Sequence, residues 1–376
     1  MKIVVCPDSF KGSLKASELA DIISEHITTL LCSSNNPILH ENTLKINHSS
    51  SKLSIEIEII KAPMADGGEG SAEVMRKHKY PVANMVYAKN PIGELISTNF
   101  YADIEGEKAF IESAQIIGLP LIAPKDRNPL ITSSYGLGQV INSAIEMGYK
   151  EITVSLGGSA TCDAGKGMLE ALVNTDLSEI TFKIVCDVRN PLVGDTGAVR
   201  IFAPQKGASP EDLPILEKRI DEFVTFAKDK YGVKESDCYT PGAGAAGGLG
   251  FAFQSILGAK TFSGIDFIMN VTEFEKTIEG ADIIISGEGK VDSQSLMGKV
   301  IDGVLQKAKS RKIPVIIMAG LVEDKSKIIE AGAAEVYEIS DKTLTIEENM
   351  MPQKTKENLL IAVKEMLKSN IFKQIL

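Results

Sequence analysis

Short apolar segments alternate with amphipathic ones in the first part of the chain. Residues 2–6 are almost all apolar, which predicts a short buried strand. Residues 13–31 carry apolar side chains three and four positions apart, the spacing of a helix with one buried face. Residues 53–61 alternate isoleucine with glutamate, which predicts a strand with one face in water. A glycine-rich turn and a helix after Gly70 complete a strand–helix–strand–helix order.

The last third of the chain repeats this pattern. Three apolar segments predict strands at residues 281–286, 313–318 and 336–339. Amphipathic segments predict helices at residues 296–310, up to about residue 331, and after Lys354. Strands that alternate with helices indicate a mainly parallel sheet covered on both faces.

The middle of the chain follows a different pattern. Turn signals separate short apolar runs between residues 85 and 113, which predicts antiparallel hairpins. We therefore predict an α/β fold in which residues 1–81 and 283–376 form a doubly wound, Rossmann-like domain. Residues 82–282 would form a mixed α/β domain inserted into it. The polar stretch at residues 32–52, rich in Ser and Asn, is interpreted as a surface insertion.

Composition excludes several classes of function. The 376 residues include 40 Lys and Arg against 50 Asp and Glu, a net charge of −10 that disfavours nucleic acid as a partner. A local group of lysines could still bind a small anion. No apolar run is long enough for a membrane span or a signal peptide, so we expect a cytoplasmic protein. Five cysteines without CxxC spacing predict neither a disulfide framework nor a zinc site.

Two glycine-containing loops follow the first two predicted strands. Residues 7–13 place Lys11 and two serines before a helix, an arrangement suited to an anion, although a capped turn with a solvated lysine would look the same. Residues 65–70 place Asp66 and Glu69 among three glycines. These acids could hold Mg²⁺ or accept a hydroxyl proton, and the alternative is a carboxylate that caps the next helix.

Three further loops carry candidate chemistry. Residues 156–167 offer backbone N–H groups and hydroxyls that could hold phosphates, or form a simple loop, and Lys166-Gly167 rules out a Walker A motif. Residues 241–250 contain a GxGxxG, but no strand is predicted before it, so we expect a phosphate contact or close helix packing in place of a dinucleotide site. Residues 286–295 combine acids with Lys290, near Lys299, and could equally be a solvated loop.

The four histidines lie outside all of these loops. This disfavours a Ser-His-Asp hydrolase and a histidine metal site. Chemistry that relies on Asp, Glu, Lys, Gly and hydroxyl groups is typical of phosphoryl transfer, where positioning and charge neutralisation dominate.

Several segments, in order along the chain, resemble the type-1 glycerate kinase family of bacteria. They are Pro7-Asp8-Ser9-Phe10-Lys11-Gly12-Ser13, Pro63-Met64-Ala65-Asp66-Gly67-Gly68-Glu69-Gly70, Arg127-Asn128-Pro129-Leu130, Gly157-Gly158-Ser159-Ala160-Thr161, Cys186-Asp187-Val188, Asn190-Pro191-Leu192, Pro204-Gln205-Lys206-Gly207-Ala208, residues 241–250 and Gly287-Glu288-Gly289. The resemblance implies a two-domain kinase that uses ATP and Mg²⁺ to phosphorylate D-glycerate in an interdomain cleft. It favours the 2-hydroxyl over the 3-hydroxyl of glycerate as acceptor.

The resemblance and the loops together give a set of candidate site residues. Asp66, Asp187 and Lys11 are the catalytic candidates, and Asp66, Glu288 and Asp292 are the metal-binding ones. Candidates for binding glycerate or phosphate are Asp8, Ser9, Gly67, Gly68, Gly158, Ser159, Thr161, Lys206, Gly242, Gly244, Gly247 and Lys299.

The chain also departs from the family pattern, and the sequence leaves some questions open. Cys162 and Ala164 stand where the family typically has Asn and Gly, the connection at residues 168–185 is short, and the one at residues 32–52 is long. A homodimer is compatible with the sequence, which leaves the oligomeric state open. Two other functions stay open, a nicotinamide-dependent oxidoreductase and a non-catalytic sensor of glycerate or nucleotide.

Overall fold

The computed structural model divides the chain into two compact units. Unit 1 comprises Met1–Asp66 and Met269–Leu376, and unit 2 comprises Gly67–Ile268. The structure describes residues 1–32, 38–40, 43–47, 54–296 and 298–375. Both divisions lie earlier in the chain than the boundaries predicted after residues 81 and 282. Helix α2 (Ser71–His78) belongs to unit 2 because it packs on that unit's strands β6 (Leu95–Ala102) and β7 (Lys108–Glu112).

Unit 1 is built around a sheet with the described strand order β13-β12-β11-β1-β4-β3-β2. The first five strands are parallel, and β3 and β2 add to the β4 edge in antiparallel register. The strands are β1 (Lys2–Val5), β2 (Ile38–His40), β3 (Thr43–Asn47), β4 (Ser54–Lys61), β11 (Ile283–Val291), β12 (Val315–Val322) and β13 (Glu335–Glu338). The α/β fold class predicted for this part of the chain is confirmed.

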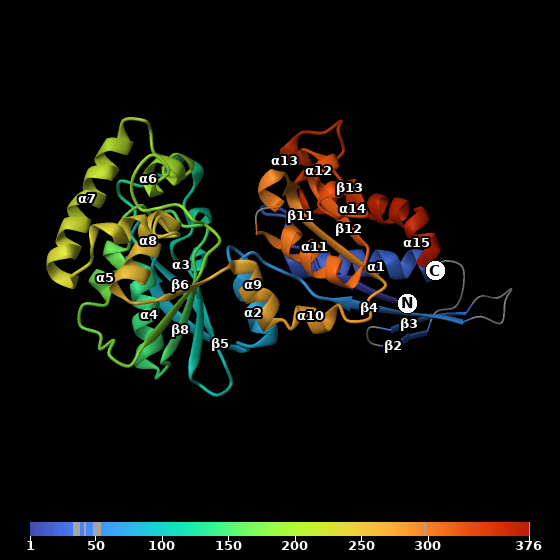
Figure 1. Ribbon diagram of the computed structural model, residues 1–376, viewed down its shortest axis with the longest axis horizontal. Coiled ribbons are helices and arrows are strands. Elements are labelled where there is room, and N and C mark those ends of the chain that lie inside the picture. The colour runs from blue at the N-terminus through green and yellow to red at the C-terminus, as the bar shows by residue number, and fades with distance from the viewer. Residues whose placement is uncertain (33–37, 41–42, 48–53, 297, 376) are drawn as a thin grey trace. The chain divides into compact units, whose positions relative to one another are not determined.

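Helices cover both faces of this sheet (Figure 1). Helices α1 (Ala16–Cys32) and α14 (Pro352–Met366) pack on one face, where Leu19, Ile23 and Leu359 share a buried core with the sheet residues Ile3 and Ile285. Helix α11 (Val300–Arg311) contacts β11 and β12. It covers the opposite face, because parallel crossovers are right-handed and the strand order changes direction between β1 and β11. The remaining helices are α10 (Phe274–Thr277), α12 (Lys325–Glu330), α13 (Ile346–Asn349) and α15 (Asn370–Ile375).

The structure adds detail to one sequence interpretation of unit 1 and corrects another. The polar stretch at residues 32–52 contains the strands β2 and β3, which its composition did not reveal, and residues 33–37, 41–42 and 48–52 of that stretch lie outside the described part of the chain. The segment at residues 286–295, interpreted as a loop, continues strand β11 as far as Val291. Gly287 permits this close pairing, because a Cβ there would lie 1.9 Å from the carbonyl oxygen of Met318 on β12.

Unit 2 contains a mixed sheet with the strand order β10-β9-β8-β7-β6-β5. Strands β5, β6 and β7 form an antiparallel meander, as predicted for residues 85–113, and β7 to β10 are parallel. Besides α2, β6 and β7, the unit has β5 (Val82–Lys89), β8 (Glu151–Ser155), β9 (Thr181–Val185), β10 (Lys260–Phe262), α3 (Ala114–Ile117), α4 (Tyr135–Glu146), α5 (Lys166–Ala171), α6 (Ala198–Phe202), α7 (Asp212–Tyr231) and α8 (Ala245–Phe251), with α9 (Gly264–Val271) at the boundary.

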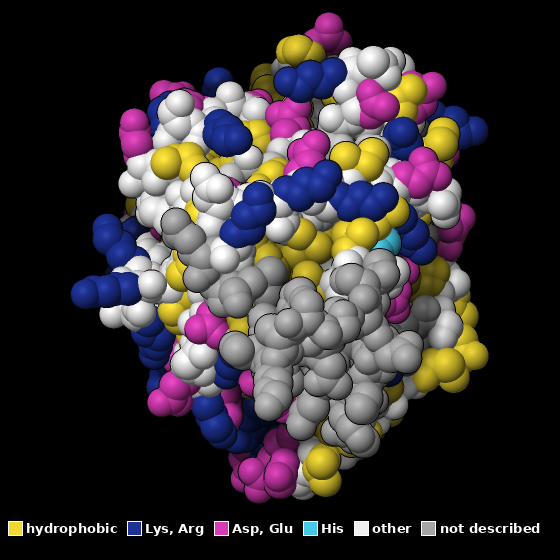
Figure 2. Space-filling model, turned by 90° about the vertical axis from the view of Figure 1, so that its right-hand side faces the viewer, with side chains coloured by type: hydrophobic (Ala, Val, Ile, Leu, Met, Phe, Trp, Pro, Cys, Tyr) yellow, Lys and Arg dark blue, Asp and Glu magenta, His cyan; other side chains and the backbone are white. Residues whose placement is uncertain are grey.

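Charge is distributed unevenly over the surface. Figure 2 shows a face of unit 1 on which Lys and Arg side chains form a row between hydrophobic groups, although the net charge of the chain is −10. Within the residues that are described, no helix is both long enough and apolar enough to cross a bilayer.

Candidate functional site

A cavity of about 620 Å³ lies in unit 1, at the carboxyl ends of its parallel strands. The strand order changes direction between β1 and β11, and ligands of open α/β sheets bind at such a point. Seven of the predicted site residues line this cavity. They are Asp8, Ser9, Lys11, Asp66, Glu288, Asp292 and Lys299.

The segment after β1 reaches this cavity because it continues alongside β11. The backbone N–H groups of Cys6 and Asp8 donate to the carbonyl oxygens of Ile285 and Gly287, each over 2.8 Å. This pairing fixes Asp8 deep in the cavity, with only 4% of its surface exposed. The chain then turns at Gly12, which has a φ of 81° that favours glycine, before α1 begins.

Acidic side chains on β11 and on the segments after β1 and β4 influence one another in the cavity. Burial, followed by the nearby charge of Asp66, raises the pKa of Asp8 to about 8. Burial also raises the pKa of Glu288, although the Ser295 hydroxyl donates a hydrogen bond to the Glu288 carboxylate and opposes the shift. Raised carboxylate pKa values in a cavity are typical of groups that exchange protons, and a cation bound beside these acids would lower the values.

Lysines stand among these acids. Lys11 Nζ lies 3.7 Å from Asp66 Oδ2, and just over half of the Lys11 side chain is exposed. Lys299 precedes the first residue of α11, and its charge lowers the pKa of Glu288. Lys290 Nζ lies 3.4 Å from Asp292 Oδ2 and 2.6 Å from Glu323 Oε1. The cavity therefore offers both carboxylates for a cation and ammonium groups for phosphate oxygens.

For the acids of the glycine-rich loop at residues 65–70, the alternative to a role in chemistry was a cap on the next helix. Asp66 does not cap that helix, α2. The N-cap of α2 is Gly70, and the N–H groups of Gly70 and Ala72 donate to the carboxylate of Glu112, over 3.1 and 2.8 Å. Glu112 lies at the end of β7 and is 3% exposed. The sequence did not reveal this contact, because about forty residues separate the two partners.

Three predicted residues come together in unit 2. The Nζ of Lys206 donates to Ser159 Oγ over 3.0 Å and to the carbonyl oxygen of Thr161 over 2.7 Å. Lys206 is 3% exposed, and this burial lowers its pKa. The hydroxyl of Thr161 is also buried and makes no hydrogen bond within the described residues. Polar groups buried in this way usually have a partner, so an anion at the loop after β8 would suit this cluster.

Other predicted residues cluster at the ends of β8 and β9. Asp187 Oδ1 accepts a hydrogen bond of 2.7 Å from the N–H of Gly264. A Cβ on Gly67 would lie 2.8 Å from the Cα of Gly264, and a Cβ on Gly157 would lie 2.8 Å from the Cα of Gly68. Gly158 has a φ of 63° in the same loop. The glycines thus let these turns approach one another closely.

The glycines at residues 241–250 have a structural explanation. A short 3₁₀ helix, Glu235–Tyr239, precedes them, so the strand required for a dinucleotide fingerprint is absent at this place, as predicted. A Cβ added at Gly244 would lie 2.1 Å from the carbonyl oxygen of Pro191, and one added at Gly247 would lie 1.9 Å from the carbonyl oxygen of Thr161. Gly242 has a φ of 89°. These contacts favour close packing, one of the two alternatives for this segment.

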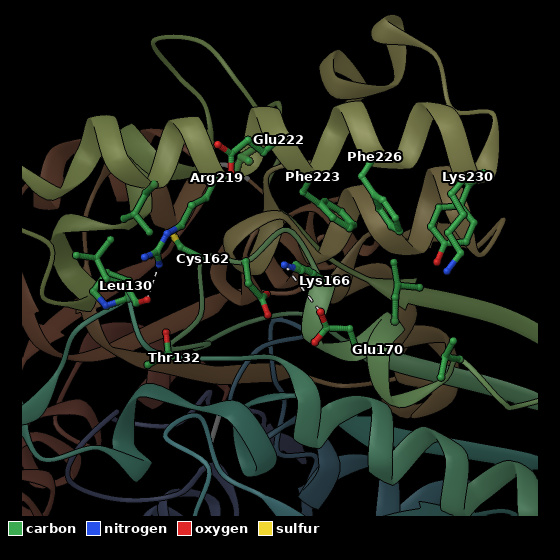
Figure 3. A pocket seen from close by; sticks show the side chains of 17 residues that line it. Leu130, Thr132, Cys162, Lys166, Glu170, Arg219, Glu222, Phe223, Phe226 and Lys230 are labelled. Atoms are coloured by element: carbon green, nitrogen blue, oxygen red, sulfur yellow. Dashed lines mark hydrogen bonds and ion pairs between the residues drawn. The ribbon is translucent and has the colours of Figure 1, made fainter.

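A second cavity, of about 690 Å³, lies in unit 2 between α5 and α7. Figure 3 shows Phe223 and Phe226 of α7 on one side, and the ion pair of Lys166 with Glu170 on α5 on the other. None of the predicted site residues lines it. It borders the loop at residues 156–167 only through Cys162, Asp163 and Lys166.

A family model described as "Glycerate kinase family" matches residues 3–175 and 173–370. The chain belongs to the glycerate kinase family. It is 34% identical over 378 residues to "Glycerate 2-kinase" of Escherichia coli, with 93% of each chain covered, and 32% identical to "Glycerate kinase" of Bacillus subtilis, with 93% and 92% covered. A solved structure, "Crystal structure of putative glycerate kinase 2 from Salmonella typhimurium LT2", matches with a TM-score of 0.75 and 29% identity over 100% of both chains.

Membership of this family confirms the predicted enzyme class, a kinase with glycerate kinase activity that uses ATP as co-substrate. Sequence reasoning missed the outer part of the unit 1 cavity in this kinase. That part is lined by Leu321, Glu338, Ile339, Ser340, Asp341, Leu344, Ile346, Asn349, Met350 and Asn358. The sequence did contain a signal for this outer part, since a strand was predicted at residues 336–339 and ligands of open sheets bind after the ends of strands.

Proposed function

We propose that this kinase transfers the γ-phosphoryl group of ATP to the 2-hydroxyl of D-glycerate, which yields 2-phosphoglycerate and ADP. The observation that carries this proposal is the convergence of Asp8, Asp66 and Glu288 with Lys11 and Lys299 at the strand ends of unit 1. Phosphoryl transfer depends on such fixed charges far more than on covalent chemistry by the protein. The preference for the 2-hydroxyl is supported by the relative that carries the name glycerate 2-kinase.

The proposed roles follow from chemistry and position. Asp66 or Asp187 orients the acceptor hydroxyl and removes its proton. Lys11, Lys206 and Lys299 neutralise the carboxylate of glycerate and the charge on the transferring phosphoryl group. Asp8, whose pKa is raised to about 8 by burial and by Asp66, is a further group able to hold a proton near neutral pH.

The residues of the cavity suit Mg²⁺. Asp66, Glu288 and Asp292 are the proposed ligands, and Mg²⁺ supplies positive charge that screens the phosphate oxygens. In the part of the chain that is described, no three Asp, Glu, His or Cys side chains are grouped so that they could hold an ion by themselves. Asp66, Glu288 and Asp292 would therefore hold Mg²⁺ only together with substrate phosphates and water, which usually complete its coordination.

Product analysis tests the proposal directly. Purified protein with ATP, Mg²⁺ and D-glycerate should release ADP, and enolase added without a phosphoglycerate mutase should convert the product to phosphoenolpyruvate. A product that enolase converts only after mutase is added would mean transfer to the 3-hydroxyl. Absence of ADP release would favour a sensor.

Substrate recognition gives a second test. Glycerol should be a poor substrate, because it lacks the carboxylate that the lysines would receive and would leave a buried cation unpaired. Equal rates with glycerol and D-glycerate would contradict recognition of the carboxylate.

The oxidoreductase alternative has lost its main support, because no strand precedes Gly242.

A further inference from the structure

The cavity of unit 1 has two chemically different ends. The inner end, at β1, β4 and β11, carries the acids and lysines already described. The outer end is formed by the end of β12 and by the segment from β13 to α14. Its apolar lining residues are Leu321, Ile339, Leu344, Ile346 and Met350.

Three of these apolar side chains are exposed. The exposed fractions are 40% for Leu321, 68% for Ile346 and 38% for Met350. A single exposed apolar side chain needs no explanation, but several that face one cavity are typical of a ligand-binding surface. Glycerate has no apolar surface with which to cover them.

The outer end is held in place by a hydrogen-bond network centred on Asn349. Asn349 Oδ1 accepts from the N–H of Asp341 over 2.8 Å and from Asn358 Nδ2 over 3.1 Å, and Asn349 Nδ2 donates to the carbonyl oxygen of Asp341 over 2.9 Å. The side chain of Asn349 thus ties the segment after β13 to α14. A surface that is already formed loses little conformational entropy when a ligand binds.

The two ends form one continuous surface. Ser13 Oγ and Thr355 Oγ1 lie 2.7 Å apart, which joins the loop after β1 to α14. Met350 packs against the same loop, because a Cβ added to Gly12 would lie 2.7 Å from its Cε atom. A ligand with an apolar ring at one end and an anionic chain at the other would match this cavity along its length.

We propose that the outer end is the subsite for the nucleoside part of ATP, with the nucleobase against Leu321, Ile346 and Met350. The triphosphate then extends toward Lys11 and Lys299 at the inner end. The volume of about 620 Å³ lies within the range of small-molecule sites. This inference rests on the proposed kinase function, and it adds where and by which chemistry the nucleotide is recognised.

The test places a carboxylate in the proposed nucleobase subsite. Leu321→Asp and Ile346→Asp each change a side chain that is exposed in the native state, so we expect both variants to fold. Ile361→Asp is the matched control, because Ile361 is 56% exposed on α14 and does not line the cavity. Calorimetric titration with Mg²⁺ and ADP measures nucleotide binding without glycerate or turnover, and steady-state kinetics give KM for each substrate.

Both cavity variants should raise the dissociation constant of ADP and the KM for ATP at least about tenfold, with the KM for glycerate changed less than about twofold. The control should match the wild-type protein in all three. Unchanged ADP affinity in both cavity variants, or a raised KM for glycerate alone, would overturn the assignment. If either aspartate variant has a lowered melting temperature, Ile346→Ser is measured in its place. We expect Ile346→Ser to raise the dissociation constant of ADP and the KM for ATP by about threefold or more.

The nucleotide subsite and the kinase function can fail separately. If the wild-type protein binds ADP and the variants weaken that binding, but no glycerate is phosphorylated, the subsite stands and the proposed function falls. If glycerate is phosphorylated and the variants bind ADP normally, the function stands and the subsite falls.

Discussion

Lys11 Nζ and Asp66 Oδ2 lie 3.7 Å apart, on the loops that follow β1 and β4. The side chain of Asp66 is 15% exposed and that of Lys11 is 54% exposed, so the pair is open to a ligand. An ion pair with one exposed member adds little to stability. We therefore expect the pair to matter mainly for chemistry.

Replacing Asp66 by Asn should separate activity from stability. Loss of a metal ligand or of a general base lowers kcat by about 10²- to 10⁴-fold. Thermal stability should stay equal or rise slightly, because removal of one acid relieves repulsion with Asp8. Asp21→Asn is the control, since Asp21 forms an exposed ion pair with Lys61 outside the cavity. Near-normal kcat in Asp66→Asn would remove Asp66 from the site.

Asp8 should make the ligand-free protein less stable as the pH rises. Folding raises its pKa from 3.8 to about 8, so between these values the folded state holds a proton that the unfolded state has lost. The stabilising contribution is therefore complete below about pH 4 and is lost as the pH approaches 8. Asp8→Asn should remove this dependence and raise the free energy of unfolding at pH 8, relative to the wild type, by on the order of 2 kcal/mol. Urea unfolding at several pH values measures it, and parallel pH curves for the two proteins would contradict the assignment.

Lys206 should contribute more to activity than to stability. Its ammonium group is buried, and burial lowers its pKa, so the charge on Lys206 costs the folded state free energy. Lys206→Met keeps the volume and removes the charge. We expect kcat/KM for glycerate to fall at least about 100-fold, with a melting temperature within a few degrees of the wild type. Lys166→Met, on the same unit but with a side chain that is 61% exposed, is the control. A large loss of stability with normal kinetics would show that Lys206 only holds the loop after β8.

Cys162 should not take part in the chemistry. Burial raises the pKa of its thiol, and only 3% of the residue is exposed, so the reactive thiolate is disfavoured. Cys162→Ser should retain activity within about tenfold of the wild type and lose about 1 kcal/mol of stability, because a hydroxyl is buried in place of a thiol. Kinetics and thermal melting of this variant give both quantities. Abolished turnover in a folded Cys162→Ser protein would require a role for the thiol.

The sequence predicted elements whose signals are local. The apolar periodicity of α1 and the alternation of Glu56, Ile57, Glu58 and Ile59 in β4 both appear in the structure with the expected exposure. These patterns depend only on which face of one element is buried, so no partner needs to be known.

Features that depend on a partner were not predictable in the same way. Strand β11 continues through Gly287, Glu288 and Gly289 because β12 lies beside it, although this composition is typical of a loop. Likewise, the carboxylate that serves the start of α2 comes from Glu112 on another element. The loop motifs still led to the inner end of the cavity, because Asp8, Asp66 and Asp292 follow strands and Glu288 lies in the glycine-containing part of the β11 sequence, which the loop motif included.

The position of β1 in the sheet has a consequence for biosynthesis. In unit 1 it lies between β4 and β11, and the whole of unit 2 comes between those two strands in the chain. On the ribosome, β1 and β4 emerge first, but the other edge of β1 gains its partner only when the last third has been made. Unit 2 is continuous and can fold during that interval. A nascent chain that stops before β11 leaves the fully buried residues Ile3, Val4 and Val5 on an open apolar edge, so premature termination yields a product prone to aggregation.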